Sequence, residues 1–421
     1  MKRSDIGSRW YFGWNIVAAA AVLTLLSTGM RLGMGPYFMP MASELGFSRT
    51  LLSAIMAGGM LCYGIALPLA GFLVSRHGTR KVLLAGAATV LVAAVWAVNT
   101  RDPWAFLFSF GGLLSVGLAF TSPVALTPVI SRWFTRRRGM ALFMLASGSM
   151  AGIAVVTPLA TLAVSWFGWQ ATLVGFSVLL AACTIPAALF VIRDVPPVST
   201  DLLPEEAQAQ RTHAASLPQQ LEPREAVRTG TFWIILFGLF CCGFSMNLLG
   251  THGMPMLMDH GFGPFTSSMT VGLVGVAAIA GTVLLGGMAD KTPRRSLLAI
   301  VYLVRGLGFF ALALASSGLE LYFIAVLMGL VWAGGAALSA AILADVYGLR
   351  LVGLLYGIAY FGHQVGAALS SFVGGWAYES FGTHWVAFGA CGALLLAAAL
   401  VSLQLPRRAA RLMSPWPAPA R

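Results

Sequence analysis

The chain has 421 residues, of which 58% are hydrophobic and only 10% are charged, and its mean hydropathy is +0.83. A soluble domain carries about 25% charged residues, so this composition excludes a soluble globular protein and indicates a membrane protein with many spans. The net charge of +12 alone would suggest nucleic-acid binding. The charge positions argue against nucleic acid as a partner, because nearly all lysines and arginines fall in alternate gaps between apolar segments.

Apolar segments long enough to cross a bilayer, which takes about 20 helical residues, recur along the whole chain. We expect the first of them to be the first span and not a cleavable signal. The predicted spans are 12–36, 50–74, 82–99, 104–130, 139–164, 169–192, 231–257, 267–289, 297–316, 320–344, 352–376 and 383–405. The sequence thus predicts an all-α membrane protein with an N-terminal six-helix bundle (1–192), a solvated cytoplasmic linker (193–230) and a C-terminal six-helix bundle with a tail (231–421).

The lysines and arginines also predict the orientation. Loops rich in these residues face the cytoplasm, and here they include both termini and the linker, whereas the opposite gaps hold only Arg49 and Arg101. We therefore expect both termini in the cytoplasm. The abundance of alanine and arginine, the scarcity of lysine and the short loops favour the inner membrane of a bacterium, where we expect a monomer.

Several classes of site are not predicted. The five cysteines lie in apolar runs and are interpreted as packing residues, so neither a disulfide framework nor a metal site is expected. The sequence lacks Gly-x-Ser-x-Gly, His-Glu-x-x-His and a phosphate-binding loop. We therefore predict no cofactor and no enzymatic activity. A membrane-embedded enzyme, and a receptor or scaffold without transport, are the alternatives from other functional classes.

The two halves of the chain repeat each other. The segment that starts at Gly71 after the second predicted span is matched by the segment that starts at Gly286 after the eighth, and Gly168 corresponds to Gly382. Duplicated six-helix halves imply a substrate site between them near the middle of the membrane.

The Gly71 segment resembles the loop motif of the major facilitator superfamily, in which a glycine at a close helix contact precedes an acidic residue and basic residues. The resemblance implies the two-bundle fold of that family and a conformational latch of carboxylate–guanidinium pairs. Ser75 replaces the acidic residue in the first copy, while the second copy retains it. The predicted gating residues are Arg76, Arg80, Asp290 and Arg294.

Two further stretches resemble the monocarboxylate-transporter and oxalate/formate-antiporter branch. One is Phe12-Gly13-Trp14; the other runs from Trp133 through three arginines to Gly152, with Phe143 in place of a usual glycine. The resemblance implies that a basic residue in the outer half of the first helix meets the substrate carboxylate. In this sequence that residue is Arg31. It also implies that His363, after Tyr356-Gly357-x-x-Tyr360, occupies the position of a lysine in the oxalate-transporting members.

Arg31 is the first candidate on physical grounds too. Arginine inside a span costs at least about 2.5–3.5 kcal/mol at the helix centre, and a guanidinium neutralises a carboxylate with two parallel hydrogen bonds. The alternative is that Arg31 lies near the outer end and extends its side chain to the lipid headgroups. His363 can donate to a carboxylate when protonated, or act as a neutral packing residue.

The remaining site candidates carry structural alternatives as well. Tyr360, Tyr37 and Tyr63 offer hydroxyl groups, although anchoring at the membrane interface also explains Tyr37. Asn247 and His252 are expected to line the outer part of the cavity or to make hydrogen bonds between helices. Arg305, in the ninth span, is interpreted as a structural residue. Asp259, His260 and Asp345 are interpreted as loop residues.

The leading hypothesis is a secondary transporter that moves a small organic anion, a monocarboxylate, by alternating access, with a proton as a candidate coupling ion. The branch commonly has an arginine in the eighth helix, and residues 278–282 have none. One permanent cation and one imidazole suit a monoanion better than a dianion. The alternative within the same fold is an exchanger or an efflux transporter for another small molecule.

Overall fold

The structure, a computed structural model, describes residues 11–134, 137–194, 222–289 and 291–406. In the first half the helices are α1 (Gly13–Leu32), α2 (Gly35–Leu45), α3 (Arg49–His77), α4 (Thr79–Val98), α5 (Pro103–Phe106), α6 (Leu114–Phe120), α7 (Pro123–Trp133) and α8 (Arg138–Pro186). In the second half they are α10 (Pro223–Val227), α11 (Gly230–Leu248), α12 (Met254–Asp259), α13 (Pro264–Ala289), α14 (Arg294–Leu314), α15 (Gly318–Leu330), α16 (Gly334–Phe381) and α17 (Trp385–Ser402). Three π-helical stretches join or extend them: Leu107–Leu113, Ala187–Val191 and Leu249–Gly253.

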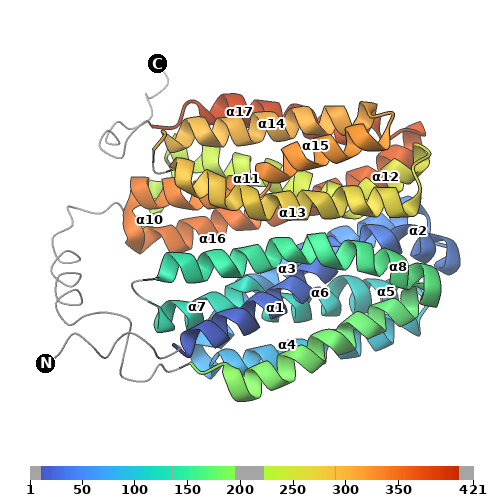
Figure 1. Ribbon diagram of the computed structural model, residues 1–421, viewed down its shortest axis with the longest axis horizontal. Helices are drawn as coiled ribbons and strands as arrows, with labels where there is room; N and C mark the ends of the chain where they lie inside the picture. Colours follow the sequence, from blue (N-terminus) through green and yellow to red (C-terminus); the bar gives the residue numbers. More distant parts are fainter. Residues whose placement is uncertain (1–10, 135–136, 195–221, 290, 407–421) are drawn as a thin grey trace, which may run out of the picture.

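Eleven helical segments of the described chain are long and apolar enough to cross a membrane. The longest, Met140–Val191, contains two spans. Its backbone reverses at Gly168, where φ is +78°, a conformation that glycine adopts without the steric cost of a Cβ atom. Figure 1 shows the second arm of α8 returning from this turn toward the opposite end of the molecule, so these segments make twelve passes.

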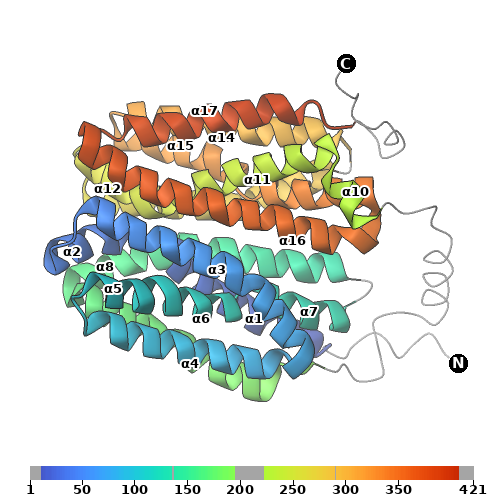
Figure 2. The same ribbon diagram turned by 180° about the vertical axis from the view of Figure 1, so that it is seen from behind.

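The helices form two bundles that lie side by side, α1–α8 in one and α10–α17 in the other (Figures 1 and 2). One end of the molecule, here called the linker end, carries α7 and α10; the other, the distal end, carries α2 and α12. Gly168 and Gly382, which the sequence repeat pairs with each other, both adopt positive φ, +78° and +65°, at corresponding turns. Their ψ values differ, 167° and 17°, so the internal repeat extends to the placement of a turn glycine and not to its conformation.

The bundles touch chiefly along two pairs of helices, α3 with α16 and α8 with α13, and also where α2 meets α12 and the π-helical stretch Leu249–Gly253. At Gly275 of α13, a Cβ atom would lie 2.6 Å from the backbone nitrogen of Ala154 in α8. At Gly64 of α3, it would lie 2.8 Å from the Cβ of Gln364 in α16. Small residues allow membrane helices to approach this closely, since lipid tails supply no hydrophobic force that drives helices together.

The fourth predicted span is broken. The helix α6 ends at Phe120 and α7 begins at Pro123, with the extended residue Ser122 between them. The hydroxyl of Ser27 in α1 donates a hydrogen bond to the backbone oxygen of Thr121 at 3.1 Å, which satisfies one carbonyl that the break exposes.

Most of the predicted linker, 193–230, lies outside the described residues, and its last part forms the short helix α10. The predicted boundaries between the two bundles and the linker stay a prediction.

Candidate functional site

Arg31 lies between the two bundles, close to the end of α1. Its guanidinium stands over the ring of Tyr63 in α3, with Cζ 4.7 Å from the ring centroid. Its Nη1 contacts the sulfur of Met60 at 3.9 Å. Met60 and Tyr63 lie near the middle of the 29-residue helix α3. The helix α2 continues beyond Arg31 toward the distal end and buries Tyr37 and Phe38. The guanidinium therefore lies deep in the molecule, which disfavours an extension to the headgroups.

The opposite bundle presents an aromatic pair at the same place. Tyr360 and His363, one turn apart on α16, stack with ring centroids 4.7 Å apart and an angle of 8° between the planes. The charge of Arg31 acts on both side chains. We call Arg31, Met60, Tyr63, Tyr360, His363 and Gln364 the central cluster. The amide nitrogen of Gln364 lies 3.5 Å from Nδ1 of His363.

The central cluster has polar atoms without partners. The Nε of Arg31 and the Oε1 of Gln364 are buried and make no hydrogen bond among the described residues. No described carboxylate lies within 4 Å of the Arg31 guanidinium. An unpaired cation inside a membrane protein costs free energy that an anion can recover. The cluster is thus suited to bind a carboxylate, with the guanidinium as a two-point donor.

The other three candidates occupy packed positions. Tyr37 is 3% exposed and belongs to the same apolar cluster as Tyr63. The amide of Asn247 in α11 donates to the backbone oxygen of Ala367 at 2.8 Å. His252 lies 2.8 Å from the backbone oxygen of Ser371 through Nε2. These contacts match the structural alternative for Asn247 and His252, while their predicted role in binding stays a prediction.

A second group of residues joins the bundles at the distal end. Arg49 at the start of α3 pairs with Asp259 at the end of α12, with Nη1–Oδ2 at 2.6 Å and Nη2–Oδ1 at 3.3 Å. The Nε2 of His384 lies 2.8 Å from the same carboxylate, and the Arg49 guanidinium stacks on Tyr378 at 3.9 Å. We call Arg49, Asp259, Tyr378 and His384 the distal gate.

A neighbouring contact strengthens the distal gate. Glu379 of α16 accepts hydrogen bonds from the backbone N–H of Thr50, at 3.0 Å, and from its hydroxyl. Thr50 lies in the first turn of α3, where unpaired N–H groups and the helix dipole favour a carboxylate. Below this contact, the hydroxyl of Ser371 donates to the backbone oxygen of Ser53.

Sequence reasoning missed the distal gate, because it treated Asp259 as a loop residue and assigned Arg49 no role. One signal was available. Arg49 is one of only two basic residues in the gaps predicted to face outward, and those gaps also hold acidic residues of the second half, such as Asp259 and Glu379.

At the linker end, two ion pairs between described residues each stay within one bundle. Arg294 pairs with Asp345, both in the second half. Asp194 accepts from the backbone N–H of Thr79 at the start of α4, at 3.0 and 3.1 Å, and lies 3.9 Å from Arg132. The first copy of the loop motif has Ser75 in place of the expected acidic residue. The carboxylate of Asp194 therefore lies beside the turn that lacks this acidic residue.

The predicted gating residues have different outcomes. Arg76 and Arg80 are exposed at the α3–α4 turn, Arg294 makes the pair just described, and Asp290 lies outside the described residues. The motif glycines Gly71 and Gly286 were expected at a close helix contact. In this structure a Cβ atom at either position would meet nothing within 4 Å. This expectation is wrong for the conformation described, in which the polar contacts between the halves gather toward the distal end. The latch role stays a prediction.

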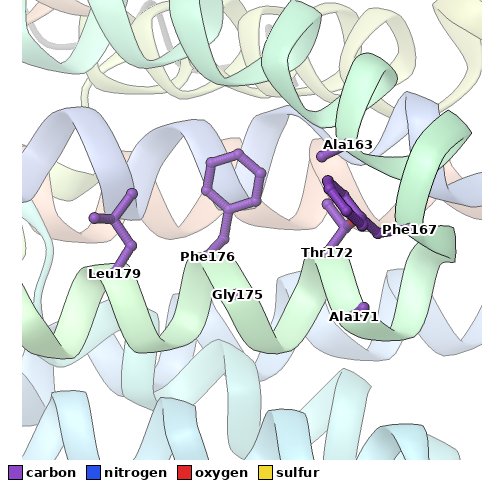
Figure 3. Close-up of a pocket in the computed structure, with 7 residues that line it drawn as sticks. All are labelled: Ala163, Phe167, Ala171, Thr172, Gly175, Phe176 and Leu179. Carbon is purple, nitrogen blue, oxygen red and sulfur yellow. The ribbon is translucent and has the colours of Figure 1, made fainter.

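Figure 3 shows a pocket of about 250 Å³ between the two arms of α8, next to the turn at Gly168. Phe167, Phe176 and Leu179 line it, and its hydroxyl-bearing residue, Thr172, donates to the backbone oxygen of Gly168. An apolar lining with no charged group suits a hydrocarbon chain and not an organic anion. The pocket is separate from the central cluster.

Comparisons with known proteins agree with this architecture. The family model of the Major Facilitator Superfamily matches residues 17–320 and 281–420. An uncharacterized MFS-type transporter of Bacillus subtilis (strain 168), YcxA, is 28% identical over 370 residues, which cover 86% of this chain and 87% of that protein. Human monocarboxylate transporter 11 is 26% identical over 410 residues, which cover 94% of this chain and 83% of that protein.

Two further matches are informative. The oxalate:formate antiporter of Oxalobacter formigenes is 23% identical, over 87% of this chain and 86% of its own. The crystal structure of a D-xylose-proton symporter superposes with a TM-score of 0.71 at 18% identity, over 94% of this chain and 99% of that one. The predicted fold and the predicted resemblance are confirmed. The chain is a multi-pass membrane protein that belongs to the Major Facilitator Superfamily, a superfamily of transporters and not of enzymes.

Proposed function

We propose that this transporter moves a small organic monocarboxylate by alternating access, with Arg31 as the anchor of the carboxylate. The observation that carries the proposal is the Arg31 guanidinium. It lies between the bundles, it has no carboxylate partner among the described residues, and its Nε is buried without a hydrogen bond. The names of the relatives, which include a monocarboxylate transporter and an oxalate:formate antiporter, support the same class of substrate.

The charge of the central cluster favours a monoanion. Arg31 is the permanent cation of the cluster, and the region of the eighth span that would supply a second arginine contains only apolar residues, glycine and threonine, from Ala278 to Thr282. The face of Tyr63 against the guanidinium and the ring of Tyr360, which stacks on His363, provide apolar surface for the rest of the substrate. One carboxylate on a small apolar body would satisfy both features.

His363 is the candidate for coupling to protons. Imidazole is the side chain that changes charge nearest neutral pH. A carboxylate bound to Arg31 would place a negative charge near His363 and favour its protonated form. An anion and a proton would then enter the site together, and the pair would cross the membrane without net charge.

The contacts between the bundles support an alternating-access state. The distal gate joins the halves, whereas the described ion pairs of the linker end lie within single halves. The basic residues place the linker end in the cytoplasm by the positive-inside rule. With this orientation the molecule is closed toward the outside, and we assign it to an inward-facing state of a bacterial inner-membrane protein.

The test is uptake of labelled small carboxylates into proteoliposomes, with and without an inwardly directed proton gradient. Wild type is compared with Arg31→Gln and Arg31→Lys, and with Arg101→Gln, which removes an exposed arginine from a distal loop. Charge-assisted hydrogen bonds contribute about 1.5–3 kcal/mol, so we expect Arg31→Gln to reduce uptake by at least tenfold, Arg31→Lys to restore part of it, and Arg101→Gln to leave it unchanged.

Two results would contradict the proposal. One is the absence of saturable uptake of every acid in the panel, also when vesicles are preloaded with an acid to allow exchange. The other is saturable uptake that does not depend on Arg31. Uptake that requires a preloaded acid would identify an exchanger and would retain the substrate class.

A further inference from the structure

A second arginine lies inside the membrane, within the second bundle alone. Arg305 is near the middle of α14 and is 0% exposed. Its guanidinium stacks on the ring of Trp332, with Cζ 4.0 Å from the centroid. Its Nη1 donates to the backbone oxygen of Trp332 at 3.4 Å and to the sulfur of Cys242 at 3.3 Å. Trp332 follows the end of α15, so this contact also serves the interruption between α15 and α16.

These contacts leave most of the local donors unused. The Nε and Nη2 of Arg305, the hydroxyl of Tyr302, the indole N–H of Trp332 and the hydroxyl of Ser339 are buried and make no hydrogen bond among the described residues. They are close together. Tyr302 lies one turn before Arg305 on α14, and its hydroxyl interacts electrostatically with Arg305 and lies beside Ser339.

The charge of Arg305 is also uncompensated. No described carboxylate lies within 4 Å of it, and the described acidic residues of the second bundle lie near the helix ends. A buried cation without a counter-ion is strongly destabilising, and native proteins satisfy nearly all buried donors with protein, water or ions. If the hydroxyls of Tyr302 and Ser339 bond to each other, at least four unused donors remain around one unpaired cation, and they indicate a ligand that accepts hydrogen bonds and carries a negative charge.

We propose that Arg305, Tyr302, Trp332 and Ser339 bind a small inorganic monoanion of the halide class inside the second bundle. A halide accepts hydrogen bonds from any direction, which suits donors supplied by two helices and the interruption between α15 and α16. The full burial of Arg305 excludes a bulky organic anion. The site is distinct from the central cluster, because it uses only residues of the second bundle and because Arg31 lies in the first.

The two sites are nevertheless connected by charge. Both arginines act on His363, so a halide at Arg305 lowers the positive potential that His363 experiences. The halide site therefore adjusts the electrostatics of the central cluster without contacting the transported substrate. The inference does not rest on the identity of that substrate.

The test measures the thermal stability of the purified protein at constant ionic strength, with chloride or bromide exchanged for gluconate, which is too large to enter. We expect a saturable rise in Tm of about 2 °C or more with either halide. The rise persists in Arg31→Gln and is lost in Arg305→Gln. A bromide anomalous-scattering peak beside Arg305 in crystals of the wild type provides evidence that needs no variant.

Several outcomes would overturn the inference. Equal stability in chloride and gluconate together with no bromide peak would show that water fills the site. A halide response that survives Arg305→Gln would place the anion elsewhere. A response that is lost in Arg31→Gln would assign the halide to the central cluster. If Arg305→Gln does not fold, the bromide peak decides, because it is measured on the wild type.

Discussion

Arg49 of α3 and Asp259 of α12 form a two-point ion pair that connects the two bundles at the distal end, with side chains only 18% and 23% exposed. Arg49 belongs to the first half and Asp259 to the second, so the pair must break whenever the bundles separate there. The carboxylate also accepts from His384. Together they define the closed side of the structure.

The first prediction concerns this pair. A partly exposed ion pair contributes about 1 kcal/mol, so Arg49→Gln should shift the equilibrium toward distal opening by roughly fivefold. Labelling of Ser53→Cys, a position buried beneath the gate, by a membrane-impermeant thiol reagent measures the shift. Asp259→Asn should increase labelling by a similar factor, and the double variant should label little faster than either single variant. Arg101→Gln is the control. If the effects of the two single variants on labelling add up in the double variant, the two residues act independently, which would contradict the prediction.

The second prediction concerns pH. Burial holds the pKa of His384 below its usual value, and the hydrogen bond that His384 donates to Asp259 opposes this effect only in part; Arg49 and His260 also lower the pKa. A histidine with a lowered pKa in the closed state stabilises that state above its ordinary pKa of about 6.5, and the stabilisation is lost as the pH falls. Lowering the distal pH from 7.5 to 5.5 should therefore increase labelling of Ser53→Cys.

The variant His384→Gln should make this labelling independent of pH over the same range, since it removes the titrating group and keeps a side chain that can hydrogen-bond to Asp259. An unchanged pH dependence in His384→Gln would assign the effect to another group. Thiol labelling itself slows as the pH falls, so the labelling rate of Ser53→Cys is divided by that of Ser43→Cys, at an exposed position.

The third prediction separates the aromatic face of Tyr63 from its hydroxyl. A cation–π contact contributes about 0.5–2 kcal/mol, and Tyr63 orients the Arg31 guanidinium from 4.7 Å. We expect Tyr63→Leu to raise the KM for the transported acid by about threefold to thirtyfold, and Tyr63→Phe to leave it close to the wild-type value. Equal losses in both variants would mean that the hydroxyl, and not the ring, serves the substrate.

The fourth prediction concerns the close approach of α13 to α8. Because a Cβ at Gly275 would lie 2.6 Å from the Ala154 nitrogen and 2.8 Å from the Met150 oxygen, Gly275→Ala should force the helices apart and destabilise the protein by about 1–3 kcal/mol. Gly175→Ala, at a position where a Cβ meets nothing within 4 Å, is the matched control. Equal Tm values for the two variants would contradict the observed packing.

Much of the architecture could be predicted because hydrophobic length and charge position are local properties of the chain. All twelve predicted spans correspond to helices, and the turn at Gly168 agrees with the predicted gap between the fifth and sixth spans. The motif residues by themselves indicate the family to which the chain belongs. The interruption of the fourth span at Ser122 also has a local cause, since Pro123 has no backbone N–H to continue the helix, whereas the hydrogen bond from Ser27 to Thr121 requires the contact between α1 and α6.

The functional residues also fall into those that the sequence indicates and those that only the tertiary structure reveals. Arg31 and His363 could be selected from the sequence, because a cation or an imidazole inside a span is costly wherever it lies. Arg305 carries the same cost, but the sequence does not reveal its stacking on Trp332 or its unused donors. Asp259 has no local signal, since an acidic residue at a helix end is ordinary; its importance comes from Arg49, which lies 210 residues away in the chain and 2.6 Å away in space.

The sequence by itself determined the membrane class, the number of spans, the duplicated halves and the presence of two intramembrane arginines, because these follow from composition, periodicity and spacing along the chain. Only the tertiary structure decided which arginine faces the junction of the bundles and which is enclosed in one of them, and which end is closed. Those properties arise from contacts between distant segments, and the packing of glycines such as Gly275 and Gly64 against the opposite bundle sets how close those segments come.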